Sequence, residues 1–182
     1  MRYRLLAALA CTALLSLALP AQMKMGEEKP GEPLASPAAT ANVTLNGKAI
    51  TINYNSPRKR GRKIVGDVVP YGEVWRTGAN PATTLVTATN LKIGTLDVPA
   101  GTYTLFTLPS KDQWLFIVSK KTGEWGIPYP EGNDLGRTPM TGKTLSSPQE
   151  NMSISFENTK GPATELHVKW ENTDQYVPVT AK

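Results

Sequence analysis

Residues 101–118 read GTYTLFTLPSKDQWLFIV, and this stretch decides the fold class. Two runs of strand-forming residues, 101–108 and 113–118, flank the turn-forming segment 109–112. The pattern predicts two antiparallel strands joined by a four-residue hairpin loop. Both runs have apolar side chains at odd and at even positions, and therefore on both faces of a strand. This pattern is typical of central strands that are covered on both faces. We therefore expect this hairpin to lie in the middle of a sheet.

Strand patterns continue on both sides of this hairpin. Apolar and polar residues alternate over 43–45 and 50–54, around an Asn46-Gly47 pair that favours a tight hairpin turn. Further strand-like segments are 83–89, 91–93, 95–98, 151–157, 164–170 and 175–179. No segment predicts a helix longer than a turn. The chain is therefore expected to be all-β, a single antiparallel β-sandwich of eight or nine short strands, with a β-barrel as the alternative.

One insertion interrupts the strand rhythm. Residues 122–149 include five Gly and four Pro and show little periodicity. A long segment of this kind in a compact domain is usually a functional loop. We expect it to fold over one end of the sandwich.

The first 21 residues have the pattern of a secretory signal peptide. Arg2 and Arg4 precede a fifteen-residue apolar run, residues 5–19, and small residues follow it. We expect cleavage after Ala21, where the apolar run has ended. A bilayer-spanning helix needs roughly 20 residues, so we expect no transmembrane helix in the mature chain.

The signal peptide is followed by a segment of different composition. Residues 22–41 contain three Pro, three Glu and two Gly without apolar periodicity. We expect them to form a disordered tether, and residues 42–182 to form the single folded domain.

Cys11 is the single cysteine of the sequence and lies within the signal peptide. A mature chain without disulfides that is nevertheless exported fits a bacterial periplasm or cell surface. Lipoprotein processing at Cys11 is the alternative, and it would anchor the chain to a membrane. The one histidine, His167, lies on the polar parity of a predicted strand, so its ring is expected to be exposed. We expect no metal site and no cofactor.

The basic residues are unevenly distributed. The formal net charge is +5, and five of the twenty Lys and Arg residues lie within residues 58–63. Such a cluster is either a solvated loop or a surface that attracts phosphate, sulfate or an anionic polymer. No aromatic residue is interleaved with these charges before Tyr71, so we do not expect nucleic-acid binding.

The segment 70–80, PYGEVWRTGAN, is the strongest candidate for a site. We expect residues 71–75 to form about one helical turn, which would place an aromatic side chain beside an Arg fork and an Asn amide. Such a set can bind a carboxylate, a sugar or a peptide terminus. The predicted ligand-binding residues are Arg62, Tyr71, Trp75, Arg76 and Asn80.

A structural interpretation of the same segment stays open. Trp75 could fill the end of the sandwich, Arg76 could pair with Glu73 or Asp67, and Asn80 could stabilise the turn. The segment would then lock the fold without binding a ligand.

Three segments carry a resemblance to a known family. GRKIVGDVVPYGEVWRTGANPATTL (61–85), VPAGTYTLFTLP (98–109) and WLFIVSKKTGEWG (114–126) resemble, in order, the secreted bacterial family named domain of unknown function 2911. The resemblance implies export and one β-rich domain, and it implies no established activity. The positions that match its signature are Arg62, Pro70, Tyr71, Gly72, Trp75, Arg76, Gly78, Ala79 and Asn80.

Three functions are compatible with the sequence. The first is a non-enzymatic binding or envelope-associated domain for a small anionic or polar ligand, such as a carbohydrate or a peptide. The second is a hydrolase that uses Asp67 or Glu73 as its acid or base. The third is a structural or interaction domain in which the 70–80 segment only locks the fold.

Overall fold

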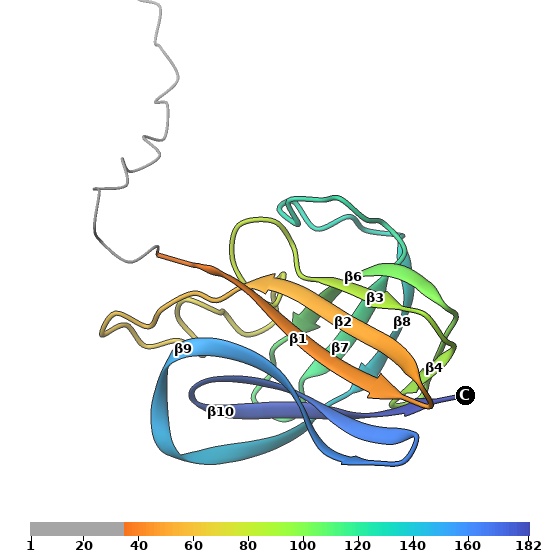
Figure 1. Cartoon of the computed structure of the whole chain (residues 1–182). Helices are drawn as coiled ribbons and strands as arrows, with labels where there is room; N and C mark the ends of the chain where they lie inside the picture. The colour runs from red at the N-terminus through yellow and green to blue at the C-terminus, as the bar shows by residue number, and fades with distance from the viewer. Residues whose placement is uncertain (1–34) are drawn as a thin grey trace, which may run out of the picture. The chain divides into compact units, whose positions relative to one another are not determined.

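The structure is a computed structural model that describes residues 35–182. The expected signal peptide, Cys11 and residues 22–34 of the expected tether lie outside the described residues. The described part contains ten strands and no helix, and therefore no helix long and apolar enough to cross a membrane (Figure 1).

The strands form two antiparallel sheets. The six-stranded sheet has the order β1 (Ala38–Leu45), β2 (Lys48–Asn55), β3 (Thr84–Thr87), β6 (Gly101–Leu108), β7 (Leu115–Ser119) and β8 (Asp134–Pro139). The four-stranded sheet has the order β5 (Leu96–Val98), β4 (Leu91–Ile93), β10 (Ala163–Ala181) and β9 (Thr141–Lys160). The sheets do not close into a barrel, so the predicted all-β sandwich is confirmed.

The hairpins predicted from turn chemistry are confirmed. β1 and β2 are joined by Asn46 and Gly47, which have φ angles of 50° and 70°. β6 and β7 pair with Leu105 opposite Val118, and β4 and β5 pair across a turn at Gly94. Asn and Gly tolerate positive φ at little steric cost, which is why these turns are readable from sequence.

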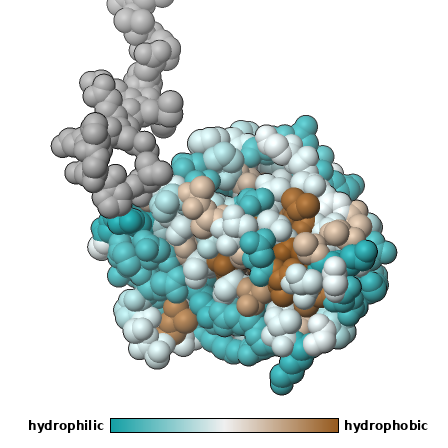
Figure 2. Space-filling view, in the orientation of Figure 1, coloured by the Kyte–Doolittle hydropathy of each residue, from teal (hydrophilic) through white to brown (hydrophobic). Residues whose placement is uncertain are grey.

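Apolar side chains fill the space between the sheets. Those from the six-stranded sheet that are almost fully buried include Leu45, Ile52, Leu85, Leu105 and Phe116, and those from the four-stranded sheet include Leu91, Ile93, Val177 and Val179. The face of the molecule in Figure 2 is mostly hydrophilic, with small apolar areas between the polar residues.

The central hairpin is covered on its second face as well. Phe106 of β6 and Ile117 of β7 are fully buried outside the main core. Tyr129, from the loop between β7 and β8, meets the Phe106 ring edge-on at a centroid distance of 5.0 Å. This confirms the expectation that both faces of β6 and β7 are covered, and it shows that the β7–β8 loop provides one cover.

Several predicted boundaries are wrong. β1 begins at Ala38, within the expected tether, because residues 38–41 pair with the end of β2 although they are mostly small and weakly strand-forming. The predicted loop 122–149 contains β8 and the first half of β9. Residues 141–149 are largely exposed, so no buried face imposes an alternation that sequence analysis could detect.

Two further elements differ from the prediction. The two expected C-terminal strands are one continuous strand, β10, which bends at irregularities near Glu171. Residues 71–75 form turns and no helix, because the backbone of Trp75 pairs with Thr107 of β6 and is drawn out to it.

The turn at Gly94 provides a test of the packing between the sheets. Its φ is 54°, and a Cβ there would overlap the buried hydroxyl of Thr138 on β8. We expect Gly94→Ala to lower the free energy of unfolding by about 2–4 kcal/mol, from backbone strain and overpacking. Gly47→Ala is the matched control, since its φ is 70° and the space around it is open.

Urea denaturation of both variants measures the difference. Gly47→Ala should cost only about 1 kcal/mol, from backbone strain alone. Equal costs for the two variants would contradict the close packing of the β4–β5 turn on β8.

Candidate functional site

The long connection between β2 and β3, residues 56–83, is attached first to the edge of the four-stranded sheet. The Lys59 N–H donates to the Glu150 carbonyl at 2.8 Å, and the Met152 N–H donates to the Pro57 carbonyl at 2.9 Å. These bonds place a short piece of the connection, around Arg58, antiparallel beside β9. A segment that leaves the six-stranded sheet is thereby fixed to the other sheet.

Trp75 attaches the same connection a second time. Its N–H donates to the Thr107 carbonyl of β6 at 2.8 Å, and the Thr107 N–H donates back at 2.9 Å. Its indole Nε1 donates to the Gly78 carbonyl at 3.1 Å, and its ring stacks on Trp170 of β10 at 5.9 Å. The part of the structural interpretation that concerns Trp75 therefore holds, since this side chain ties the two sheets together.

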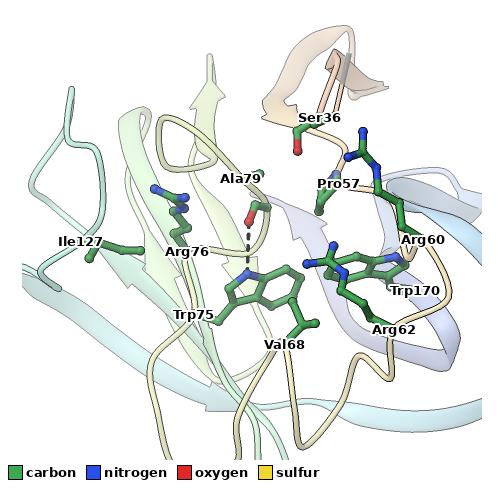
Figure 3. Close-up of a pocket in the computed structure, with 12 residues that line it drawn as sticks. Ser36, Pro57, Arg60, Arg62, Val68, Trp75, Arg76, Ala79, Ile127 and Trp170 are labelled. Atoms are coloured by element: carbon green, nitrogen blue, oxygen red, sulfur yellow. Dashed lines mark hydrogen bonds between the residues drawn. The ribbon is translucent and has the colours of Figure 1, made fainter. Parts of the chain in front are cut away.

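Beside this indole pair lies an open cavity of about 570 Å³ (Figure 3). Three arginines line it, Arg60, Arg62 and Arg76, and we call it the arginine cavity. In Figure 3, Arg76 lies on one side of Trp75, and Arg60 and Arg62 lie on the other. The volume is within the usual range of sites for small molecules.

Two of these arginines are held by neutral groups. Arg62 donates from Nε to the Lys59 carbonyl at 3.1 Å and from Nη2 to the Arg58 carbonyl at 2.9 Å. Arg76 donates from Nη1 to the Trp125 carbonyl at 3.1 Å, with its guanidinium 5.2 Å from the Trp125 ring centroid. Burial lowers the pKa of Arg76 from its ordinary value, but a guanidinium stays protonated in proteins.

Within residues 35–182, none of the three cavity arginines forms an ion pair with a carboxylate. By contrast, Arg137 pairs with Asp134 at 2.7 Å. The Glu150 carboxylate lies near Arg60, but it accepts the Arg60 backbone N–H at 2.8 Å. No carboxylate of the described chain therefore forms an ion pair with a guanidinium of the cavity.

Glu171 of β10 positions the loop that carries Arg60 and Arg62. Its carboxylate accepts the Ile64 N–H at 3.0 Å and pairs with the Lys59 ammonium at 3.3 Å. Burial favours a higher pKa for Glu171, but the hydrogen bond from Ile64 and the Lys59 charge outweigh it, so its pKa lies below the ordinary value.

Three of the five predicted ligand-binding residues, Arg62, Trp75 and Arg76, line the arginine cavity. Tyr71 does not, because it lies by a separate hollow of about 190 Å³ beside residues 110–113. Asn80 is exposed and is not among the lining residues; its amide donates to the Ser36 carbonyl at 3.4 Å.

Among the cavity residues that the sequence does not predict as ligand-binding are Arg60 and Trp170. Arg60 belongs to the basic cluster, whose charge gives the only signal for it in the sequence. Trp170 comes from β10, where it alternates with polar residues in line with Leu166 and Val168. This pattern predicts a core residue and does not predict a place in a site. Its contact with Trp75 spans 95 positions of sequence, and no local pattern encodes it.

The carboxylates considered for hydrolysis lie elsewhere. Asp67 and Glu73 are both exposed, and neither lines the arginine cavity. Neither forms an ion pair with Arg76, so that expected pairing is wrong. The guanidinium of Arg76 uses the Trp125 carbonyl instead.

The expected exposure of His167 is also wrong, since its side chain is only 2% exposed. Its Nδ1 lies 2.7 Å from the Asp174 carboxylate and its Nε2 lies 3.2 Å from that of Glu165. The ring stacks on Tyr176 at 4.9 Å. The irregular pairing near Glu171 bends β10, so that its later residues cover the histidine. Within the described chain, no group of three or more His, Cys, Asp or Glu residues could hold a metal ion.

Comparison with known proteins gives one finding. A family model described as a protein of unknown function (DUF2911) matches residues 36–179. No curated protein and no solved structure matches the chain. The matched range contains every residue named above as lining the cavity.

The Glu171 contact predicts a pH-dependent stability. We expect Glu171→Gln to lower the free energy of unfolding at pH 7, because the carboxylate holds Ile64 and Lys59. The folded-state pKa is lowered, so this contribution is present above the unfolded pKa, about 4.3, and is lost as pH falls through the folded value. The cost of the substitution should therefore shrink between pH 5 and about pH 3.

Urea denaturation at pH 7 and at about pH 3 tests this. Glu131→Gln, in the exposed β7–β8 loop, is the control and should have little effect at either pH. A cost of Glu171→Gln that is as large at pH 3 as at pH 7 would show that the charge of the carboxylate is not what holds the loop.

Proposed function

The chain belongs to the DUF2911 family, and we propose that it is an exported, non-enzymatic binding domain of the cell envelope that holds a small anionic ligand in the arginine cavity. One observation carries this proposal. Three arginines without carboxylate partners in the described chain line a cavity of about 570 Å³. Export is supported by the signal-peptide pattern of the first 21 residues.

The charges of the cavity favour an anion. Guanidinium groups that share one cavity repel one another, and a bound anion relieves that repulsion. An Arg fork matches carboxylate, phosphate and sulfate oxygens in a bidentate manner. Because Arg62 and Arg76 are already held by backbone carbonyls, less side-chain entropy is lost on binding.

The composition of the cavity supports binding over hydrolysis. Among residues 35–182, its lining includes no Asp, Glu, His, Cys, Lys or Tyr, and Ser36 supplies the one hydroxyl. General acid–base catalysis requires a titratable side chain within hydrogen-bond reach of the substrate. Asp67 and Glu73 lie outside the lining, so they do not supply it there.

The structural role of the 70–80 segment is compatible with this function. The Trp75 ring joins the connection to β10 by stacking on Trp170, and its indole N–H donates to the Gly78 carbonyl of the same turn, whereas the Arg76 guanidinium lies at the cavity. A rigid attachment next to a charged opening is a common arrangement of binding sites on β-scaffolds.

Substitution of the arginines tests the proposal. We expect the protein to bind inorganic phosphate, and Arg60→Ala and Arg76→Ala each to weaken this binding about tenfold or more, the loss of a charged hydrogen bond. Isothermal titration calorimetry measures the affinity, and higher salt should reduce it. Lys48→Ala removes an exposed charge from the start of β2, outside the cavity lining, and should leave the affinity unchanged.

Thermal unfolding of the same variants separates site from scaffold. The Arg60 side chain has no hydrogen bond within the described chain, so Arg60→Ala should keep the wild-type Tm. Should the wild-type protein bind neither phosphate nor sulfate nor acetate, and Arg76→Ala lower the Tm by many degrees, the structural interpretation would replace the binding function.

A further inference from the structure

The arginine cavity has an apolar part as well as a charged one. Among the twelve described residues that line it, Ser36 and the three arginines have polar side chains, and the indole N–H groups of Trp75 and Trp170 already donate to backbone carbonyls. Val68 and Trp75 lie between Arg76 and the Arg60–Arg62 pair in Figure 3, and Ile127 lies beside Arg76. A ligand that contacts the arginines therefore also contacts aliphatic and aromatic surface.

The mouth of the cavity exposes large apolar side chains. Within residues 35–182 the exposed large hydrophobic residues are Tyr71, Val86, Trp125 and Ile127. Two of the four, Trp125 and Ile127, lie two positions apart on the β7–β8 loop, with 54% and 66% of their surface exposed. Ile127 lines the cavity, and the Arg76 guanidinium lies over the Trp125 ring. Neighbouring exposed apolar residues at a charged site are typical of a surface that meets an apolar partner.

We propose that the arginine cavity takes an amphiphilic anion. Its acidic head contacts guanidinium groups of the cavity, and its apolar chain or ring lies along Val68, Trp75 and Ile127. This inference rests on the proposed function and narrows its ligand class.

Simpler ligands use only part of this cavity. A lone phosphate or sulfate ion can contact the arginines, but it leaves the apolar wall in water and fills little of 570 Å³. A sugar needs hydrogen-bond partners for several hydroxyls, and Ser36 and the arginine forks are the polar side chains in the lining. An apolar chain displaces water from the wall and gains about 0.8 kcal/mol for each CH₂ group that it buries.

A series of phosphate monoesters tests the apolar contact. Isothermal titration calorimetry with inorganic phosphate, butyl phosphate and hexyl phosphate should show an affinity that rises with chain length, by up to about fourfold for each CH₂ group buried. Hexanol, which lacks the anionic head, should not bind detectably.

The series separates this inference from the proposed function. If hexyl phosphate binds no more tightly than inorganic phosphate, the assignment of an amphiphilic ligand is wrong and the proposed anion site remains. If none of the phosphates binds, both proposals fall. If hexanol binds as well as hexyl phosphate, the arginines are not what selects the ligand, and both proposals fall.

Ile127→Ser tests the apolar wall without altering the arginines. It should weaken hexyl phosphate several-fold and leave inorganic phosphate unchanged, because Ile127 meets only the chain. Val86→Ser is the matched control: Val86 is 41% exposed on β3, outside the cavity lining, and its substitution should change neither affinity. Equal effects of Ile127→Ser on both phosphates, or no effect on either, would overturn the assignment.

An amphiphilic anion can come from solution or from a lipid headgroup, and vesicles distinguish these sources. Co-sedimentation with phosphatidylglycerol vesicles but not with phosphatidylcholine vesicles, competed by hexyl phosphate and weakened by Trp125→Ala, would identify a membrane lipid. Hexyl phosphate binding without co-sedimentation would identify a free amphiphile. Vesicle binding that hexyl phosphate does not displace would contradict a lipid in this cavity.

Discussion

The stacking of Trp75 on Trp170 is the interaction on which the arrangement of this domain depends. One indole belongs to the connection between β2 and β3, and the other belongs to β10 of the opposite sheet. The first part of the connection is also held at β9 and by Glu171, and the stack fixes its second part to β10. With Trp75 also paired to Thr107 of β6, the two sheets and the connection share one rigid point. The arginine cavity lies beside that point, so its walls are positioned by the core of the fold.

The fold could be predicted where local patterns determine it. Residues 101–118 have apolar side chains on both faces of the two strands, which predicts a central hairpin. Asn46 and Gly47 tolerate positive φ and are flanked by alternating apolar residues, which predicts the β1–β2 turn. The first half of β9 carries none, since both of its faces are mostly in water and only its backbone pairs with β10. A strand without a buried face leaves no hydrophobic period in the sequence.

The site could be predicted in part for a related reason. Arg62, Trp75 and Arg76 are close in sequence, and a turn-rich segment brings them together. Tyr71 lies apart from them, because the Gly72 N–H donates to the Pro109 carbonyl and Tyr71 lies by residues 110–113. Trp170 could not be found, because its place in the cavity depends on how the two sheets pack.

The order in which the cavity residues occur along the chain has a consequence for biogenesis. Among the described residues, its lining begins at residue 35 and ends at Trp170 of β10. During synthesis the arginines therefore emerge long before the indole that completes their surroundings. A nascent chain can expose the basic cluster but cannot yet offer the finished cavity, so ligand binding becomes available only when β10 has docked. Any ligand that prefers the finished cavity also stabilises the docking of β10, because it binds the folded chain better than the partly folded one.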